Sequence, residues 1–288
     1  MKRKKTIVYK LDSKTKEKQV AAILEFSAAG KETLQQYFQN DGETVNEESK
    51  FTYDDAGNLI QTKVSNSAGE SQQADRTYDS QNRLIEEKVF VDEVLEQHKT
   101  VQWADDSLSS RTTYYDADGN MSNVVDTLYL DKDVLQREAI YDEEEQLIEA
   151  YDYEYENGNL VKKIGDFGGF STEEHYKYTF DDNGNITSKQ KEDDEGDTET
   201  QEIEYHSNGK KAKQHVTLVS GIQEIAKYDE QERVIQVLRI DVTGYNSFES
   251  QSKYTEDHDY MTEKVIRNDE SVTQFFYEHE FHEAKENA

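Results

Sequence analysis

Turn-forming residues recur along this chain at nearly constant intervals. Gly30, Gly42, Gly57 and Gly69 follow one another at similar distances, and most later glycines keep this spacing or a multiple of it. Gly165 lies off this ladder. Each interval leaves about seven or eight residues for a segment, which is a normal strand length and too short for a helix of usual size. The spacing therefore predicts an all-β chain.

A second period, about twice as long, overlies the first, because an aromatic residue precedes every second turn. These aromatics are Phe26, Tyr53, Tyr78, Trp103, Tyr129, Tyr155, Phe180, Tyr205, Tyr228, Tyr254 and Tyr277. We take six of them as repeat anchors: Tyr53, Tyr78, Tyr155, Phe180, Tyr205 and Tyr228. The pattern predicts one antiparallel meander of about 20 strands, built from β-hairpin repeats of about 25 residues.

The segment 53–59 shows the physical basis of the repeat. Asp54 suits the first position of a type I turn and Gly57 the fourth. A left-handed residue after such a turn completes a common hairpin connection, and glycine tolerates that conformation best. Tyr53 and Leu59 should then face each other across the two strands, and such a pair contributes about 0.2–1 kcal/mol relative to two alanines. Repeated along the chain, the anchors would form a ladder across the sheet.

Hydrophobic residues make up 33% of the chain, too few to fill a thick two-layer core. Apolar and polar residues alternate moderately along the strands. Ile60, Thr62 and Val64 would share one face of their strand, and that face is richer in apolar residues. We therefore expect a coiled or open single sheet with one wet face. The alternative is a β-propeller, because two repeats supply the four strands of a blade. Residues 1–288 would form one repeat domain, with an N-terminal cap strand at 1–20 and a charged tail at 278–288.

Acidic residues exceed basic ones by 63 − 33 = 30. Such a chain repels nucleic acid and anionic membranes, so we expect neither as a partner, and it attracts a basic protein, a polycation or a divalent metal. It has no cysteine, which excludes disulfides and thiolate chemistry. The basic residues 2–5 precede an apolar stretch of only four residues, which is too short for a signal peptide. We therefore expect a cytoplasmic protein.

Five stretches resemble the YD repeats of Rhs-type proteins. They are YDDAGNLI (53–60), YDSQNRLIEE (78–87), YDADGNM (115–121), YENGNL (155–160) and FDDNGNI (180–186). The resemblance implies a β-hairpin repeat sheet that coils into a spiral, which in large Rhs proteins forms a shell around a toxic C-terminal domain. The family's self-cleaving motif contains proline, and this chain has none. We therefore expect a short form without a toxin domain. A flat ribbon, as in MORN proteins, is a further alternative.

Two turns resemble fragments of calcium loops, at 116–120 and 181–185. An EF-hand needs Gly at position six and Glu at position twelve, and neither turn has both. Turn chemistry explains their Asp and Asn residues without a metal. His279 and His282 are three residues apart, where a zinc-protease helix needs four. Since no nucleophile elbow, phosphate loop or dinucleotide fingerprint occurs either, we expect no enzyme, metal or cofactor.

Three segments are candidate partner-binding sites. The densest acidic loop, with Asp193, Asp194 and Glu195, could dock a basic partner. Phe167 and Phe170, in a glycine-rich loop, could anchor a partner or fold back over a sheet edge. Trp103, with tyrosines of the sheet face, could bind carbohydrate.

The leading hypothesis is a non-catalytic scaffold that binds a protein, in its specific form an immunity or chaperone-like partner of a basic toxin. The alternatives are a carbohydrate-binding repeat module and a hydrolase that uses surface carboxylates.

Overall fold

The computed structural model describes residues 2–11, 15–132, 134–241, 243, 247–254, 260–267 and 272–282. These residues form a sheet of 22 strands. The strands are β1 (Arg3–Leu11), β2 (Lys18–Phe26), β3 (Glu32–Phe38), β4 (Val45–Tyr53), β5 (Leu59–Asn66), β6 (Ser71–Tyr78), β7 (Leu84–Val91), β8 (Val94–Trp103), β9 (Ser109–Tyr115), β10 (Met121–Asp131), β11 (Val134–Tyr141), β12 (Leu147–Glu156), β13 (Asn159–Asp166), β14 (Ser171–Phe180), β15 (Ile186–Asp193), β16 (Thr198–Tyr205), β17 (Lys211–Thr217), β18 (Gln223–Tyr228), β19 (Val234–Ile240), β20 (Phe248–Tyr254), β21 (Tyr260–Arg267) and β22 (Val272–Phe281).

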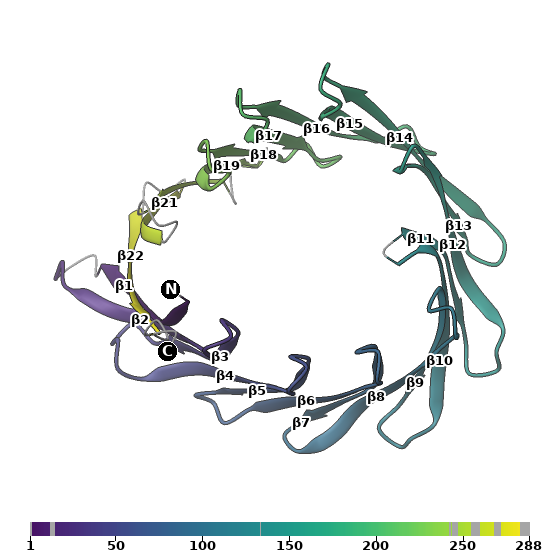
Figure 1. Ribbon diagram of the computed structural model, residues 1–288, viewed down its shortest axis with the longest axis horizontal. Coiled ribbons are helices and arrows are strands. Elements are labelled where there is room, and N and C mark those ends of the chain that lie inside the picture. The colour runs from purple at the N-terminus through teal and green to yellow at the C-terminus, as the bar shows by residue number, and fades with distance from the viewer. Residues whose placement is uncertain are drawn as a thin grey trace, which may run out of the picture. The chain divides into compact units, whose positions relative to one another are not determined.

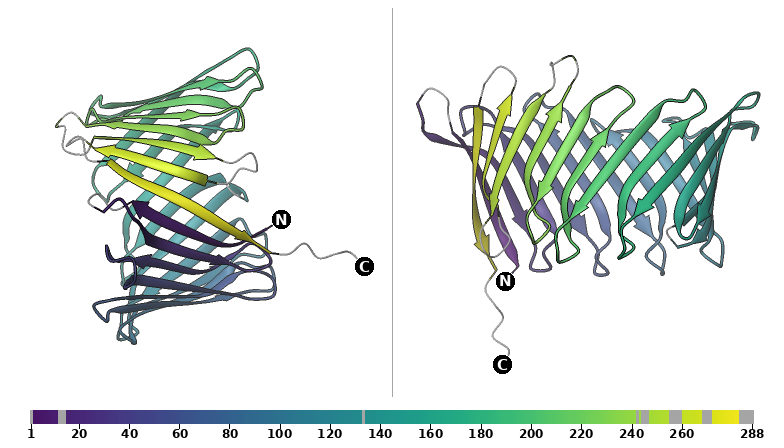
Figure 2. Two further views of the ribbon diagram at one scale, coloured as in Figure 1. Left: turned by 90° about the vertical axis from the view of Figure 1, so that its left-hand side faces the viewer. Right: turned by 90° about the horizontal axis from the view of Figure 1, so that it is seen from above.

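The chain divides into two compact units. Unit 1 holds the described residues within 1–6, 21–172 and 280–288, and unit 2 holds those within 7–20 and 173–279. In unit 1, successive strands from β2 to β13 pair antiparallel (Figure 1). In unit 2, successive strands from β14 to β22 do the same, and Figure 2 shows neighbouring strands running in opposite directions. The predicted all-β antiparallel meander is confirmed.

The two ends of the meander are not free edges. β1 pairs with β22 as well as with β2. The backbone N–H of His282 also donates to the carbonyl of Lys2 (3.0 Å). An open sheet would leave β1 and β22 as unpaired edges, whose free N–H and C=O groups invite other chains to add on. Because these two strands pair with each other, the predicted open sheet is wrong. The propeller alternative is wrong as well, because the pairing in unit 1 continues from strand to strand without a break after every fourth strand.

The turn between β4 and β5 has the predicted conformation. The N–H of Gly57 donates to the carbonyl of Asp54 (3.0 Å), and Gly57 has a φ of +91°. Tyr53 and Leu59 are partners in the register, next to a shift that marks a bulge. The carboxylate of Asp54 accepts hydrogen bonds from the backbone N–H (2.7 Å) and the side-chain amide (2.9 Å) of Asn58. Asp54 therefore stabilises the turn through hydrogen bonds to its backbone carbonyl and to its side chain.

A hydrogen bond joins three of the six anchors, and two further aromatics of the same series, to the preceding repeat. The hydroxyl of Tyr78 donates to the carbonyl of Leu59 (3.1 Å), and that of Tyr155 to the carbonyl of Leu135 (2.8 Å). Three more donors make the same kind of bond to a carbonyl of the preceding repeat: Trp103 Nε1 to Leu84 (2.9 Å), Tyr205 to Ile186 (2.8 Å) and Tyr254 to Val234 (2.6 Å). Phe180 has no hydroxyl, and 50% of it is exposed.

Basic side chains cover several of the aromatic rings. Lys31 Nζ lies 4.9 Å from the ring centre of Tyr53, and Lys211 Nζ lies 5.2 Å from that of Tyr228. Each cation comes from the repeat before its ring, as the hydrogen bonds do. Contacts of this kind contribute about 0.5–1 kcal/mol at exposed sites. The rings therefore link neighbouring repeats by two kinds of polar contact in addition to strand pairing.

The apolar core is small. Among the described residues, the buried hydrophobic ones are Val8, Ala22, Val124, Ala139 and Ala150. A single sheet has no second layer to cover it, which agrees with the low hydrophobic content. Backbone pairing, cross-strand pairs and the links between repeats must therefore supply most of the stability. Within the described part of the chain, no helix has the length and apolarity that a membrane crossing requires.

The ends of the chain fall partly within strands. β1 and the first residues of β2 cover most of the predicted cap segment 1–20. β22 includes residues 278–281 of the predicted charged tail. Residues 283–288 of that tail lie outside the described residues.

Replacing Tyr155 by phenylalanine is expected to lower the free energy of unfolding by about 0.5–1.5 kcal/mol, because the Leu135 carbonyl loses its donor. Tyr37 is the matched control, since its hydroxyl contacts Gln35 on the same strand and 42% of it is exposed. We expect Tyr37→Phe to change the unfolding free energy by less than about 0.5 kcal/mol. Urea denaturation measures both, and equal losses would rule out a stabilising link between repeats.

Candidate functional site

The loop that joins β13 to β14 in unit 1 is short and hydrogen-bonded. The backbone N–H of Phe167 donates to the carbonyl of Phe170 (3.0 Å). The carboxylate of Asp166 accepts the N–H of Gly168 (3.1 Å), and Gly168 has a φ of +72°. A left-handed residue at this position favours glycine. The loop is thus held in one conformation by its own backbone contacts.

Three rings meet at this loop, and we call Tyr151, Phe167 and Phe170 the aromatic cluster. Phe167 stacks on Phe170, with ring centres 4.9 Å apart and an angle of 14° between the planes. Its other contact is edge-on to Tyr151, at 5.8 Å and 84°. Both are favoured arrangements for aromatic pairs and contribute about 0.5–1.5 kcal/mol beyond area burial. Phe167 is therefore a platform that fixes Phe170.

Gly165 gives Phe167 the space to fold back. Gly165 is buried and pairs with Tyr151 across β12 and β13. A Cβ atom at this position would lie 2.8 Å from Phe167 Cε2 and 2.8 Å from Thr172 Oγ1. The glycine that lies off the turn ladder therefore serves the aromatic cluster rather than a turn.

The outer part of the cluster is open to solvent. Phe170 is 65% exposed, and on β12 Ile148 is 48% and Leu147 39% exposed. A Cβ at Gly168 would lie 3.9 Å from the carbonyl of Ile148, so the loop lies beside the start of β12. Large exposed apolar groups that share one place on a surface are typical of interaction sites.

Acidic groups lie in the turn beside this apolar surface. The turn before Leu147 carries four carboxylates in succession, at 142–145, of which Asp142 accepts backbone N–H groups of its own turn and Glu145 pairs with Arg111. Glu149 accepts a hydrogen bond from the Tyr151 hydroxyl (3.0 Å). Burial, and secondly this contact with Glu149, raise the pKa of Tyr151, so the phenol stays neutral. Lys163 Nζ lies over the Tyr151 ring at 4.4 Å. The arrangement can hold an apolar group with positive charge around it.

The acidic loop belongs to unit 2, in the turn between β15 and β16. Asp193 accepts the backbone N–H groups of Glu195 (3.0 Å) and Asp197 (2.9 Å). Asp194 accepts the backbone N–H of Glu173 (2.6 Å). Two of the three candidate carboxylates therefore hold backbone in place. The carboxylate of Glu195 is exposed to solvent.

The indole N–H and one face of Trp103 contact residues of its own sheet. Its Nε1–H donates to the Leu84 carbonyl, and Arg83 lies 5.4 Å from the ring centre. Arg83 is itself paired with Asp79 (2.7 Å). A tryptophan that stacks on sugar rings needs a free face, and this ring has a guanidinium over it. Trp103 is therefore a weaker carbohydrate platform than the sequence indicates.

The two calcium-like turns are closed by their own residues. Asp116 accepts the N–H groups of Asp118 (3.0 Å) and Asn120 (2.8 Å). Asp181 accepts those of Asn183 (2.9 Å) and Asn185 (2.9 Å). These hydrogen bonds, chiefly those from Asn120 and Asn185, lower the pKa of both aspartates. The carboxylates act as caps of β-turns. Within the described residues, no group of three or more His, Asp or Glu is placed to hold a metal ion.

Leu147, Ile148 and Tyr151 were not candidates from the sequence. Leu147 and Ile148 repeat the Leu–Ile pairs at 59–60 and 84–85, so the sequence alone gives no signal that distinguishes this surface.

Comparison with known proteins gives matches to solved structures alone. No protein-family model matches the chain, and no curated protein matches it. A crystal structure of TcdB2-TccC3-TEV is 14% identical, with a TM-score of 0.31, over 91% of this chain and 16% of that one. A porin-like protein from Bacteroides uniformis is 12% identical, with a TM-score of 0.31, over 96% of this chain and 98% of that one. The chain thus spans about a sixth of the TcdB2-TccC3-TEV chain.

Proposed function

We propose that this protein is a non-catalytic scaffold of the YD-repeat, Rhs-like kind that binds a basic protein partner in the cytoplasm. The observation that carries the proposal is Phe170, which is 65% exposed although its loop and ring are held in place. Its stack on Phe167 stabilises the fold modestly and leaves most of the Phe170 ring in water. An ordered, exposed aromatic ring can anchor a partner, since aromatic residues are enriched among those that carry the binding energy at interfaces.

The charge of the chain supports a basic partner. The net charge of −30 and the carboxylates at 142–145 favour positive residues around the anchor. Such steering raises the association rate and weakens as salt is added. In its most specific form, the proposed partner is a basic toxin, and the protein acts as its immunity or chaperone-like partner.

Replacing Phe170 by serine tests this function. The tagged protein is used to capture partners from cells that produce it, and the affinity of the basic protein recovered is then measured. We expect Phe170→Ser to weaken binding by about 30-fold, which corresponds to about 2 kcal/mol. Phe180→Ser, at a ring that is 50% exposed in unit 2, is the control and should leave the affinity unchanged. Equal affinities of both variants, or a captured protein that is acidic, would contradict the proposal.

A further inference from the structure

A surface pocket lies on unit 1 away from the aromatic cluster, over strands β4 to β7. Its volume is about 520 Å³. Sites for small ligands usually measure about 300–1,000 Å³. The side chains that matter for its chemistry are those of Glu48, Lys50, Lys63, Ser65, Gln73 and Phe90.

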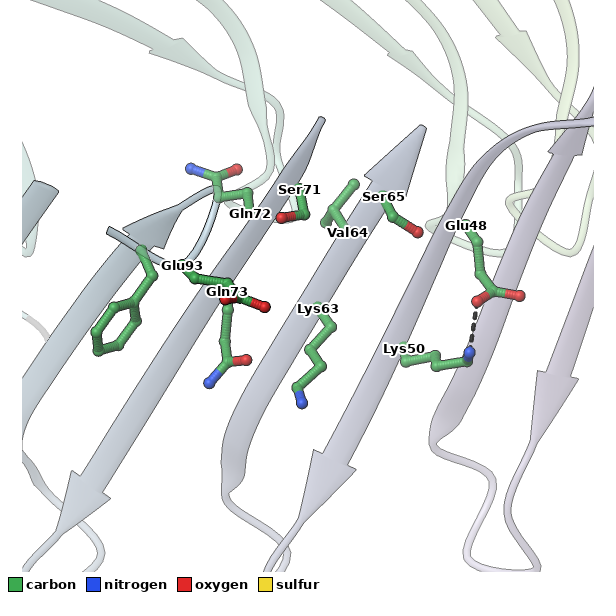
Figure 3. Close-up of a pocket in the computed structure, with 10 residues that line it drawn as sticks. Glu48, Lys50, Lys63, Val64, Ser65, Ser71, Gln72, Gln73 and Glu93 are labelled. Carbon is green, nitrogen blue, oxygen red and sulfur yellow. Dashed lines mark ion pairs between the residues drawn. The ribbon is translucent and has the colours of Figure 1, made fainter. Parts of the chain in front are cut away.

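Four of these side chains form one row across the strands. Lys50 is the register partner of Lys63, Lys63 of Gln73, and Gln73 of Phe90. Residues directly opposite each other share a face of the sheet, so the row presents two ammonium groups, an amide and a phenyl ring on one side. Figure 3 shows Lys63 between Lys50 and Gln73.

Two carboxylates beside this row, those of Glu48 and Asp75, already have partners. Glu48 pairs with Lys50 (2.5 Å) and accepts the side-chain amide of Gln36 (2.7 Å), as the dashed line to Lys50 in Figure 3 marks. These two contacts lower the pKa of Glu48. Asp75, in the next row, accepts the amides of Gln61 (2.7 Å) and Gln73 (2.8 Å).

Lys63 is left without a carboxylate. Its side chain is exposed, and it makes no ion pair within the described part of the chain. Glu48 offsets the charge of Lys50, so in this row Lys63 is the ammonium group that a bound anion could meet.

The other groups of the pocket fit hydroxyl groups and an apolar ring face. Serine hydroxyls and glutamine amides both donate and accept hydrogen bonds, as sugar hydroxyls do. Phe90 adds an apolar surface on which a sugar ring can pack. Glu93, from the turn after β7, also lines the pocket and would repel a second negative charge.

We propose that this pocket binds an acidic saccharide, with its carboxylate on the Lys63 ammonium, its hydroxyls on Ser65 and Gln73, and a ring face on Phe90. This site is independent of the partner surface around Phe170. It also differs from the Trp103 carbohydrate site expected from the sequence, because Trp103 does not line this pocket.

Binding of galacturonate is the test, followed by calorimetry or by chemical shifts on the full chain. We expect galacturonate, which has a single carboxylate, to bind more tightly than galactose, which lacks the carboxylate, and than benzoate, which lacks the hydroxyls. Lys63→Gln should weaken the binding by about tenfold, the effect of losing one charge-assisted hydrogen bond. Lys63→Arg keeps the charge and should retain most of the affinity.

The matched control is Lys227→Gln in unit 2. Lys227 is also exposed and also lies directly opposite a lysine, Lys213, so the variant loses the same charge. It should bind galacturonate as the unchanged protein does. The proposal is overturned if galactose or benzoate binds equally well, if Lys63→Gln and Lys227→Gln have the same effect, or if no binding occurs at millimolar galacturonate.

Discussion

Gly165→Ala is expected to lower the free energy of unfolding by about 1–3 kcal/mol, the usual cost of an added carbon in a filled space. The backbone φ of Gly165 lies outside the left-handed region, so alanine brings no backbone strain. The added Cβ would lie 2.8 Å from both Phe167 Cε2 and Thr172 Oγ1. The Phe167 ring cannot move away without losing its contacts with Tyr151 and Phe170. The cost therefore comes from displacing the Phe167 ring and the Thr172 hydroxyl.

The control for this variant lies in the same segment. A Cβ at Gly169 would meet no atom within 4 Å, and its φ is also outside the left-handed region. Gly169→Ala should change the unfolding free energy by less than about 0.5 kcal/mol. Urea denaturation gives the stabilities, and near-ultraviolet circular dichroism reports the packing of the rings. Equal stability losses at Gly165 and Gly169 would show that the cluster is not packed as described.

The second large effect is a loss of stability in strong acid. Six turn aspartates have pKa values below their ordinary value of 3.8, because the N–H groups and side chains of their turns donate to them; they are Asp41, Asp54, Asp79, Asp116, Asp181 and Asp229. Their folded state binds protons less readily than the unfolded chain. Their contribution is complete above about pH 3.8 and is lost as the pH falls through the lower folded values.

Thermal unfolding between pH 7 and pH 2 measures this effect. The scans need about 0.5 M salt, because protonation of the other acids relieves repulsion and would mask the loss. Asp54→Asn should be less stable at pH 7 and should lose less stability in acid than the unchanged protein. The neighbouring Asp55, whose carboxylate accepts no hydrogen bond from the residues described, is the control, and Asp55→Asn should keep the full acid transition. Stability that rises steadily down to pH 2 would contradict the role of these turns.

Local features of the fold could be predicted from the sequence. The bonds that close the turn from Asp54 to Asn58 join near neighbours in the chain, so residue type alone indicates them. The pairing of Tyr53 with Leu59 follows from that turn. The pairing of β1 with β22 could not be predicted, because it joins opposite ends of the chain and no local pattern fixes it. The hydrogen bonds from anchors reach the neighbouring strand, which belongs to the preceding repeat, and the period of the aromatics does not specify which carbonyl accepts them.

The candidate site could be predicted in part, for a similar reason. Phe167 and Phe170 attract notice as two aromatics in a glycine-rich loop. Leu147 and Ile148 do not attract notice in the sequence, since other strands of this chain also begin with leucine and isoleucine. The sequence did not show that the Trp103 ring is covered, because the Leu84 carbonyl that accepts its hydrogen bond and the Arg83 side chain over its face belong to the preceding repeat. Asp193 and Asp194 looked free, but they hold backbone N–H groups of unit 2.

Photo-crosslinking from position 170 tests most directly whether the aromatic cluster binds a partner. p-Benzoylphenylalanine replaces Phe170 in one variant and Phe180 in another, and both are illuminated in cells that produce the protein. We expect the first variant to form a covalent adduct with one basic protein, diminished by Gly165→Ala, and the second to form none. Absence of an adduct at position 170, or the same adducts at both positions, would contradict the assignment of this surface.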